Sequence, residues 1–351
     1  MSEFSSDVLS VIGEAVVIAR DGNIVFSNSP AAAILGGSTV GKTLPAVFGE
    51  EIAAAQGDDF AAGVSLNGKN CIVRSSRKNG EQILIFSETQ YDGTMINDAF
   101  LFSMRSSLMV MTMSVNRCRK LAAESGREEL LMTADALSKS LASTQRLVTN
   151  ISDVCGIRSQ TLRFCPEVTD VSRLFSEYTN IAADLLPEVE ISFSGPKGLL
   201  ASVDTDLMKH LFTNLVSNAV RHGQCKELRI RLIDSPAYVI LGVNDDGNGI
   251  KSTELYNVFE RYLGSLTLSG INHGAGLGLT AVMGIARLHG GTVLLESREG
   301  RGTAVRVSLK KNLAGAKLHS YSVSEENDVK ELLTGLSDCV DEKRFRETYE
   351  D

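Results

Sequence analysis

The sequence predicts a multidomain α+β protein, with a small α/β domain first, an antiparallel helical hairpin next and an α/β sandwich last. Strand-like runs bounded by turn signals occupy residues 7–90, and apolar residues spaced three and four apart occupy residues 94–157. Between residues 168 and 310, strand-like runs alternate with helical patterns, which is typical of a sheet covered by helices. The expected boundaries are 1–90, 91–165, 166–312 and 313–351.

Composition describes ordinary globular material and excludes several classes of function. The 351 residues are 43% apolar and 22% charged, and the net charge of −8 argues against a nucleic-acid partner. We find no secretion signal and no apolar run near the about 18 residues of a membrane span, so we expect a cytoplasmic protein without a membrane span. The six cysteines show no zinc-binding spacing and are interpreted as reduced, mostly buried thiols.

The first 90 residues alternate strand-like runs with turn signals, and Asp21 to Asn28 follow the pattern Asp-Gly-x-Ile-x-x-x-Asn. This order and this pattern resemble a PAS sensor domain. No cysteine or histidine lies where it would obviously hold haem or flavin, so a PAS fold used for dimerisation or relay stays open beside a ligand sensor. The strand-like runs are Ala15–Ala19, Ile24–Phe26, Cys71–Arg74 and Gln82–Phe86, the last two joined by a turn at Lys78–Gly80.

The next segment has the apolar periodicity of two helices separated by a break at Ser125–Gly126. Each helix has a narrow apolar seam, and one hairpin cannot enclose its own seam. Pairing two copies into a four-helix bundle would bury both, so we expect a homodimer through residues 94–157. The methionines here are interpreted as core filler. The two seams are Leu101, Met104, Leu108, Met111, Val115 and Cys118, then Ala134, Leu137, Leu141, Thr144, Val148, Ile151 and Cys155.

The last part of the chain alternates strands with two helices, at 204–222 and 279–289. The charge-rich tail, 313–351, has apolar spacing for one short amphipathic helix between Val329 and Val340, and no function follows from it. The expected strands are Glu190–Phe193, Glu227–Leu232, Ala237–Val243, Thr292–Ser297 and Thr303–Leu309.

Four short segments between Asn214 and Gly278 carry the chemistry of a nucleotide pocket. In the first, Asn214 and Asn218 lie four residues apart on one helix face, with Arg221 and His222 one turn later. An amide oxygen suits a magnesium ion that carries phosphates, and a guanidinium can offset phosphate charge.

The second segment places a carboxylate beside small backbone. Asp245 follows an apolar strand and precedes Gly247 and Gly249, so backbone without side chains lies next to an acceptor for the amino group of adenine. A tight turn alone would account for this segment if it stood by itself.

The remaining segments are Val258–Tyr262 and a glycine run. Gly274, Gly276 and Gly278 precede a helical pattern, so their amides can face phosphates at a helix N-terminus. The spacing fits neither a dinucleotide fold nor a P-loop. The Gly- and Ser-rich stretch 262–276 is interpreted as a lid over the nucleotide.

Together the four segments resemble the N, G1, F and G2 boxes of the histidine kinase catalytic domain, a Bergerat-type ATP-binding fold shared with gyrase, Hsp90 and MutL proteins. The resemblance implies ATP and Mg as cofactors and covers about 94–310. Gyrase-like ATPases place a glutamate base where this chain has Asn214, so autonomous hydrolysis is not expected. The implied roles are Asn218 as magnesium ligand with Asn214 nearby, Arg221 with His222 at the phosphates, Asp245 with Gly247 and Gly249 at the adenine, Thr303 as its support, and Gly274, Gly276 and Gly278 as the phosphate lid.

The same resemblance shows that the phosphoacceptor is missing. The family's His-Glu-x-x-x-Pro-Leu motif aligns with Phe102–Leu108, which puts Phe102 at the histidine position and Ser103 at the acidic position. Phenylalanine cannot accept a phosphoryl group, so ordinary autophosphorylation cannot occur in this chain.

Three interpretations follow from the missing acceptor. The first is a signalling protein that binds Mg-ATP and acts by conformation or partner. The second is a catalytic domain active in trans on a partner histidine kinase or another protein. The third is a serine kinase resembling anti-sigma factors, with Ser103 or an external serine as acceptor. A response regulator or another histidine kinase is the expected partner beside the second copy.

Overall fold

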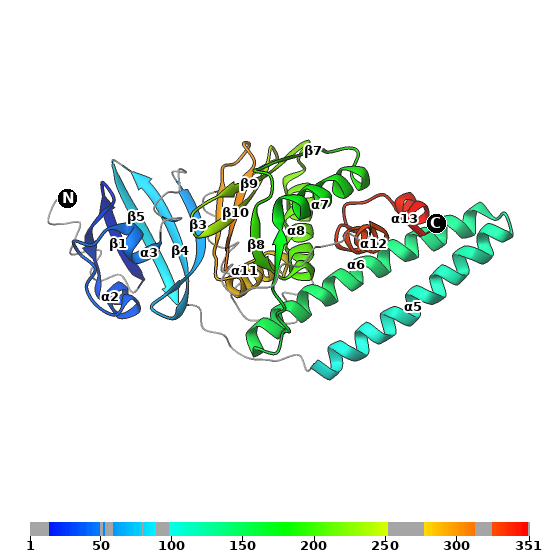
Figure 1. Ribbon diagram of the computed structural model, residues 1–351, viewed down its shortest axis with the longest axis horizontal. Helices are drawn as coiled ribbons and strands as arrows, with labels where there is room; N and C mark the ends of the chain where they lie inside the picture. Colours follow the sequence, from blue (N-terminus) through cyan, green and yellow to red (C-terminus); the bar gives the residue numbers. More distant parts are fainter. Residues whose placement is uncertain are drawn as a thin grey trace.

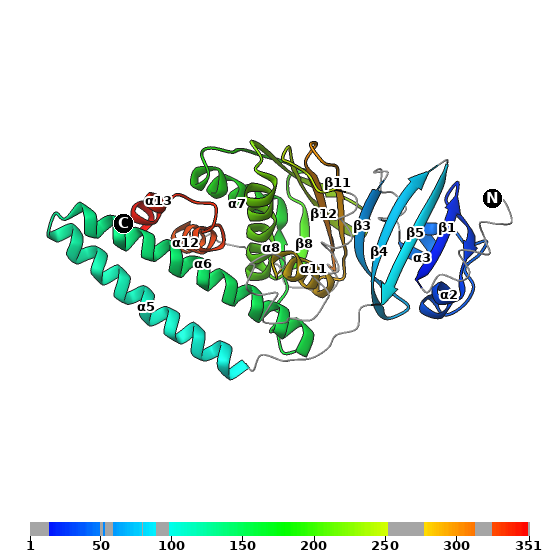
Figure 2. The same cartoon turned by 180° about the vertical axis from the view of Figure 1, so that it is seen from behind.

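The computed structural model describes residues 14–49, 52, 59–78, 80–88, 98–251, 277–312 and 325–349. An N-terminal sheet lies at one end of the molecule, an α/β unit lies in the middle, and a long helical hairpin crosses the other end (Figure 1). The view from behind shows the same order (Figure 2). The second helix of the hairpin lies against the α/β unit, and the first helix lies on the side of the second that faces away from this unit.

The N-terminal sheet is antiparallel, with the strand order β2-β1-β5-β4-β3. Asn28 joins the sheet to the first helix, because its side-chain oxygen accepts from the backbone N–H of Val16 at 2.9 Å and of Ala31 at 3.1 Å. The strand β3 was not expected from the sequence. The elements are β1 (Ala15–Arg20), β2 (Asn23–Ser27), α2 (Ser29–Leu35), α3 (Leu44–Phe48), β3 (Asp59–Leu66), β4 (Lys69–Lys78) and β5 (Glu81–Glu88).

The helical hairpin and its break are confirmed as helices α5 (Asp98–Glu124) and α6 (Glu128–Ser159). Gly126, between them, has a left-handed φ of 63°, which suits glycine. Part of the expected seam closes within one chain, where Leu101, Leu108, Val148 and Ile151 form a buried cluster. The seam stays open nearer the turn, since Met111 is 52% exposed and Leu137 is 49% exposed.

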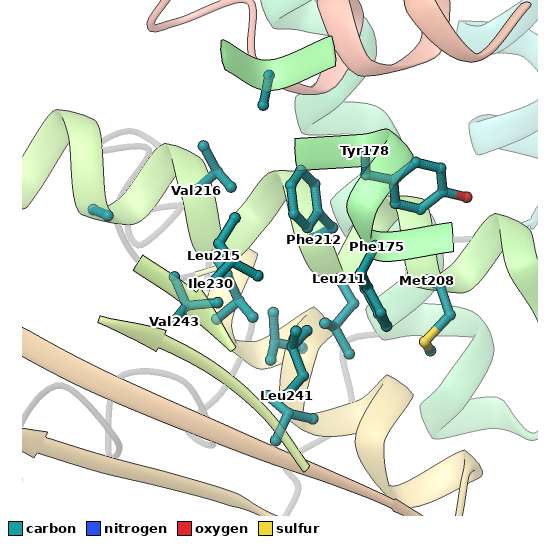
Figure 3. Packing of buried hydrophobic residues seen from close by; sticks show 14 of the residues in the cluster. Phe175, Tyr178, Met208, Leu211, Phe212, Leu215, Val216, Ile230, Leu241 and Val243 are labelled. Carbon is teal, nitrogen blue, oxygen red and sulfur yellow. The ribbon is translucent and has the colours of Figure 1, made fainter. Parts of the chain in front are cut away.

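The α/β unit has helices α7, α8 and α11 packed against its sheet (Figures 1 and 3). Phe175, Phe212 and Leu241 are fully buried at the contact between helices and strands, which explains the apolar periodicity of both (Figure 3). β6, α7 and β8 were not expected. The elements are β6 (Glu167–Asp170), α7 (Val171–Leu185), β7 (Glu190–Ser194), β8 (Leu200–Val203), α8 (Thr205–Asn218), η1 (Ala219–Gly223), β9 (Glu227–Asp234), β10 (Tyr238–Asp245), α11 (Leu277–Leu288), β11 (Val293–Ser297) and β12 (Thr303–Lys310).

The two sheets are joined edge to edge. β3 pairs antiparallel with β11, and Gly63 lies opposite Val293, so the ten-stranded sheet runs β2-β1-β5-β4-β3-β11-β12-β10-β9-β7. Helix α11 packs on the joint: a Cβ added at Gly63 would lie 2.0 Å from the Cε of Met283. The N-terminal sheet therefore contacts the α/β unit directly, without the hairpin between them.

The chain ends in two helices where the sequence indicated one. They are α12 (Glu325–Gly335) and α13 (Glu342–Tyr349), and both lie beside α6 (Figures 1 and 2). In the part of the chain that the structure describes, we find no helix both long and apolar enough to cross a membrane.

Candidate nucleotide site

The site is built around Asp245, the last residue of β10. Its Oδ1 accepts hydrogen bonds from the backbone N–H of Gly247 at 2.9 Å and of Thr303 at 3.1 Å. Burial raises the pKa of Asp245 above the ordinary range, while the two amide donors act in the opposite direction. One oxygen thus fixes the carboxylate, and the other has no hydrogen-bond partner among the described residues.

Glycines allow three segments to approach at this point. A Cβ on Gly247 would lie 2.2 Å from the carbonyl oxygen of Gly223, and one on Gly302 would lie 1.9 Å from the carbonyl oxygen of Asp245. Gly249 has a φ of 64°, and a Cβ there would lie 2.1 Å from the carbonyl oxygen of Arg298. The close packing therefore requires glycine at these positions, whichever ligand binds.

The sequence did not single out Gly223, Ser297 or Gly302, and the structure adds them to the site. Ser297 Oγ lies 2.8 Å from Thr303 Oγ1 and accepts from the backbone N–H of Ile250 at 2.8 Å. Gly223 ends the helical segment that carries Asn218, and Gly302 directly precedes Thr303. A glycine next to a predicted site residue was the available signal for both.

Asn218 lies where α8 widens into the π-helical turn η1. Such turns are frequent at functional sites because they change the direction of the following side chains. No described residue makes a hydrogen bond with the Asn218 side chain, which is half-buried. In the turn itself, burial and the guanidinium groups of Arg221 and Arg146 lower the pKa of His222. An amide oxygen that has no partner among the described residues fits a hard cation such as magnesium.

Asn214, one turn earlier, faces the hairpin. It is 2% exposed; its Nδ2 donates to Asn150 Oδ1 of α6 at 2.8 Å and to the His210 carbonyl at 2.9 Å. Its Oδ1 accepts from Asn150 Nδ2 at 3.1 Å. The amide of Asn214 is thus occupied by protein partners, whereas the amide of Asn218 has none among the described residues.

Of the glycines expected to form a phosphate lid, only Gly278 lies within the described residues. Gly278 lies in α11, and a Cβ there would lie 2.8 Å from Asn214 Oδ1. Gly274, Gly276 and the segment Val258–Tyr262 lie outside the described residues. The structure thus places Gly278, inside α11, beside the Asn214 face of α8.

The hairpin positions Phe102 and Ser103 are both exposed on α5, and Phe102 is 74% exposed. Helix α6 lies between α5 and the α/β unit (Figures 1 and 2). Within one chain, the structure does not bring these two residues to the site around Asp245.

Comparison with known proteins identifies the domain that carries most of this site. Residues 203–313 match the family described as histidine kinase-, DNA gyrase B-, and HSP90-like ATPase. The sensor-type histidine kinase PrrB of Mycobacterium leprae is 33% identical over 129 residues, which are 36% of this chain and 28% of that protein. The sensor histidine kinase GtrS of Pseudomonas aeruginosa is 39% identical over 103 residues, which are 29% of this chain and 20% of that protein. The chain thus matches less than a third of the length of these relatives.

Two solved structures are similar in part. The match with the ATP-binding domain of PrrB from Mycobacterium tuberculosis covers 42% of this chain and 98% of the PrrB chain, at 26% identity and a TM-score of 0.35. The match with histidine kinase ThkA, solved in complex with the response regulator protein TrrA, covers 89% of this chain and 99% of the ThkA chain. Its identity is 18% and its TM-score is 0.40. Residues 203–313 of this chain therefore carry a Bergerat-type ATPase domain that is similar to those of sensor histidine kinases.

Proposed function

We propose that this chain is a two-component signalling protein of the histidine kinase type that binds Mg-ATP and cannot phosphorylate itself. In this proposal a PAS-like domain spans 1–90, a degenerate dimerisation hairpin spans 91–165 and the catalytic-type ATP domain spans 166–312. Residues 313–351 form a C-terminal segment that follows the ATP domain. A cytoplasmic location stays a prediction.

The observation that carries the proposal is the geometry of Asp245. Its Oδ1 is held by the amides of Gly247 and Thr303, which leaves the second oxygen available to accept from the amino group of adenine. Guanine presents a carbonyl oxygen at the same position, and a carboxylate cannot donate to it. Asp245 would therefore select adenine, and Thr303 would support it through its backbone N–H.

Magnesium would be held by Asn218. The half-buried amide lacks a described protein partner, and its oxygen is a ligand type that magnesium accepts together with phosphates and waters. Magnesium would neutralise phosphate charge there. Asn214 would support this site by fixing α8 against Asn150 of the hairpin, and Arg221 would supply charge for the phosphates.

The missing acceptor is the second part of the proposal. Phe102 stands exposed on α5, at the position where the family carries its histidine, and the five histidines of the chain all follow residue 209. Without a nucleophile at this position, the hairpin cannot take the γ-phosphoryl group. Signalling would then proceed by conformation, by partner binding or by transfer to another protein.

A second copy of the chain is the proposed partner for the hairpin. Its exposed apolar side chains would be covered by the same residues of the other copy, which is the usual way to complete a four-helix bundle. A response regulator or another histidine kinase stays a proposed partner. The exposed apolar residues of the hairpin are Phe100, Phe102, Met109, Val110, Met111, Met113, Leu121, Leu130, Met132 and Leu137.

The test uses γ-labelled ATP with magnesium on three proteins: the wild type, Phe102→His with Ser103→Glu, and that double variant with Asn218→Ala. We expect label on the double variant alone, in the acid-labile form typical of phosphohistidine. Calorimetric titration of the unlabelled wild type with Mg-ATP must show binding for the proposal to stand. A wild type without nucleotide affinity would refute it.

Other labelling patterns identify the alternatives. Acid-stable label on the wild type that disappears in Ser103→Ala would indicate a serine kinase. Label on an added histidine kinase or other protein, lost with Asn218→Ala, would indicate catalysis in trans. ATP binding without label on any variant would indicate a nucleotide-sensing scaffold.

A further inference from the structure

The C-terminal helical pair, residues 325–349, is packed into the main core of the protein. Leu332, Leu333 and Leu336 are 0% exposed, and they belong to the same buried cluster as Phe212 and Leu215 of α8. The approach of the backbones is close, because a Cβ on Gly335 would lie 2.6 Å from Thr213 Cγ2. The pair is therefore a docked element of the ATP unit.

Polar contacts tie the helical pair to α8 as well. Lys209 of α8 is largely buried, and its Nζ contacts Asp328 Oδ1 at 3.2 Å and the carboxylate of Glu331, both on α12. These ion pairs hold the first helix of the pair, and Lys209 precedes Asn214 and Asn218 on α8 by more than one turn and more than two turns.

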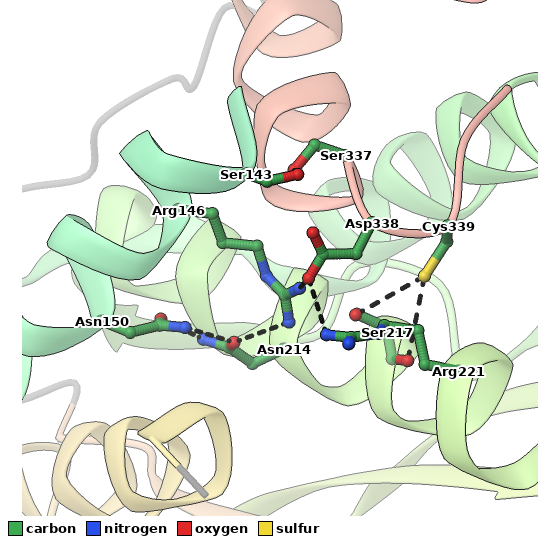
Figure 4. A network of polar contacts seen from close by, with 9 residues as sticks. All are labelled: Ser143, Arg146, Asn150, Asn214, Ser217, Arg221, Ser337, Asp338 and Cys339. Atoms are coloured by element: carbon green, nitrogen blue, oxygen red, sulfur yellow. Dashed lines mark hydrogen bonds and ion pairs between the residues drawn. The ribbon is translucent and has the colours of Figure 1, made fainter. Parts of the chain in front are cut away.

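The turn after α12 reaches the nucleotide-site end of α8. Asp338 Oδ2 accepts from Nη1 of Arg146 at 2.5 Å and from Nη1 of Arg221 at 2.7 Å (Figure 4). The neighbouring Cys339 thiol contacts Ser217 Oγ at 3.5 Å. One carboxylate from the C-terminal pair thus bridges the hairpin helix α6 and the turn η1.

The same contacts extend to Asn214. Arg146 Nη2 lies 3.5 Å from Asn214 Oδ1, and Asn214 exchanges two hydrogen bonds with Asn150 (Figure 4). Asp338 therefore belongs to a network that sets how the hairpin lies against α8.

The Asp338 carboxylate is the negative charge that balances two guanidinium groups in this network. Only 11% of the Arg146 side chain is exposed, so its charge is largely removed from water, and Asp338 is its counter-ion. Arg221, at 39% exposure, shares the same carboxylate oxygen. Without that carboxylate, two guanidinium groups would lie close together and repel each other.

We propose that the C-terminal helical pair regulates the nucleotide site, with Asp338 as an internal competitor for Arg221. This inference rests on the proposed function, in which Arg221 contacts phosphates. Nucleotide phosphates and the Asp338 carboxylate are both anions that use the same guanidinium, so strong engagement of one weakens engagement of the other. The docked pair lowers nucleotide affinity, and by thermodynamic reciprocity nucleotide binding loosens the docked pair.

The test compares Asp338→Asn with Asp341→Asn in the full chain. Asp341 is an exposed carboxylate three residues later whose Oδ1 accepts from the backbone N–H of Lys343, a contact that asparagine can keep. Hydrogen exchange is measured over 325–349 and 205–223 without nucleotide, and Mg-ATP affinity is measured by calorimetry. Asp338→Glu, which keeps the charge, shows whether the carboxylate itself matters.

We expect Asp338→Asn alone to speed exchange over 325–349 and to tighten Mg-ATP binding about fivefold or more. Adding Mg-ATP to the wild type is expected to speed exchange over the same segment. Equal exchange in the two asparagine variants overturns the role of Asp338 in docking, and equal affinities overturn the competition. If no protein binds Mg-ATP, the proposed function fails and the competition with it, whereas the exchange comparison still decides whether Asp338 holds the helical pair.

Discussion

Replacing Asp245 with asparagine separates its contribution to nucleotide binding from its contribution to the fold. The asparagine Oδ1 can keep both acceptor bonds, from Gly247 at 2.9 Å and Thr303 at 3.1 Å. Its amino group would then replace the second carboxylate oxygen and oppose the amino group of adenine. The variant should fold normally and bind ATP poorly.

The magnitude follows from the bond that is lost. A hydrogen bond to a charged group is worth about 1.5–3 kcal/mol, and a factor of ten in affinity corresponds to about 1.4 kcal/mol. The dissociation constant for Mg-ATP should therefore rise about 10- to 150-fold in Asp245→Asn. Calorimetric titration with Mg-ATP and Mg-GTP measures it, and discrimination against GTP should decrease.

The stability of the folded protein should not fall in Asp245→Asn, although its ATP affinity does. Burial raises the pKa of Asp245, so the folded protein favours its protonated form. The stability from this form is present below the ordinary aspartate pKa and is lost as pH rises through the raised folded value. At neutral pH the ionised carboxylate therefore costs stability, and Asp245→Asn should unfold at the same or a higher urea concentration. ATP affinity of the wild type should fall on acidification through the same pKa.

The neighbouring Asp246 provides the matched control. It is exposed, and its Oδ1 accepts from the backbone N–H of Glu227 at 2.9 Å and of Lys226 at 2.8 Å, which lowers its pKa. Its contribution to stability is present above the ordinary aspartate pKa and is lost as pH falls through the lowered folded value. Asp246→Asn should therefore lose some stability and keep the wild-type affinity for Mg-ATP. Equal ATP affinity in Asp245→Asn and the wild type would refute the assignment of Asp245 to adenine.

Three further predictions concern packing and buried charge. Leu333→Ala, in a fully buried position of the C-terminal helical pair, should lower the free energy of unfolding by about 2–5 kcal/mol in urea titrations; a loss below about 1 kcal/mol would contradict its burial. Gly63→Val should cost about 1–3 kcal/mol through overpacking against Met283 at the sheet joint, and Met283→Ala should recover part of this loss, whereas simple additivity would contradict the contact. Arg119→Ala removes the cation beside the Asp135 carboxylate, at 3.3 Å and with both side chains nearly buried, and should cost about 3–5 kcal/mol. Arg119→Ala combined with Asp135→Asn should lose less than the sum of the two single losses, and simple additivity would argue against the ion pair.

The long periodic elements could be predicted from the sequence, because periodicity is a local property. The hairpin helices, their break at Ser125–Gly126 and five strands of the α/β unit were all predicted and are present. The strand β3 was missed because Asp59–Leu66 is rich in small residues, including Gly63, and lacks a strong strand pattern. The helix α13 was missed because Glu342–Tyr349 is mostly charged.

The sequence by itself determined the chemical parts of this protein: the ordered segments with Asn218 and Asp245, and the phenylalanine at position 102. Residue type and spacing along the chain suffice for these conclusions, since each segment is short. Only the tertiary structure decided that Asn214 faces Asn150, that β3 joins β11, and that Asp338 holds Arg146 and Arg221. Such contacts join residues far apart in the chain through backbone pairing or single side chains, so no local pattern in the sequence encodes which partners meet.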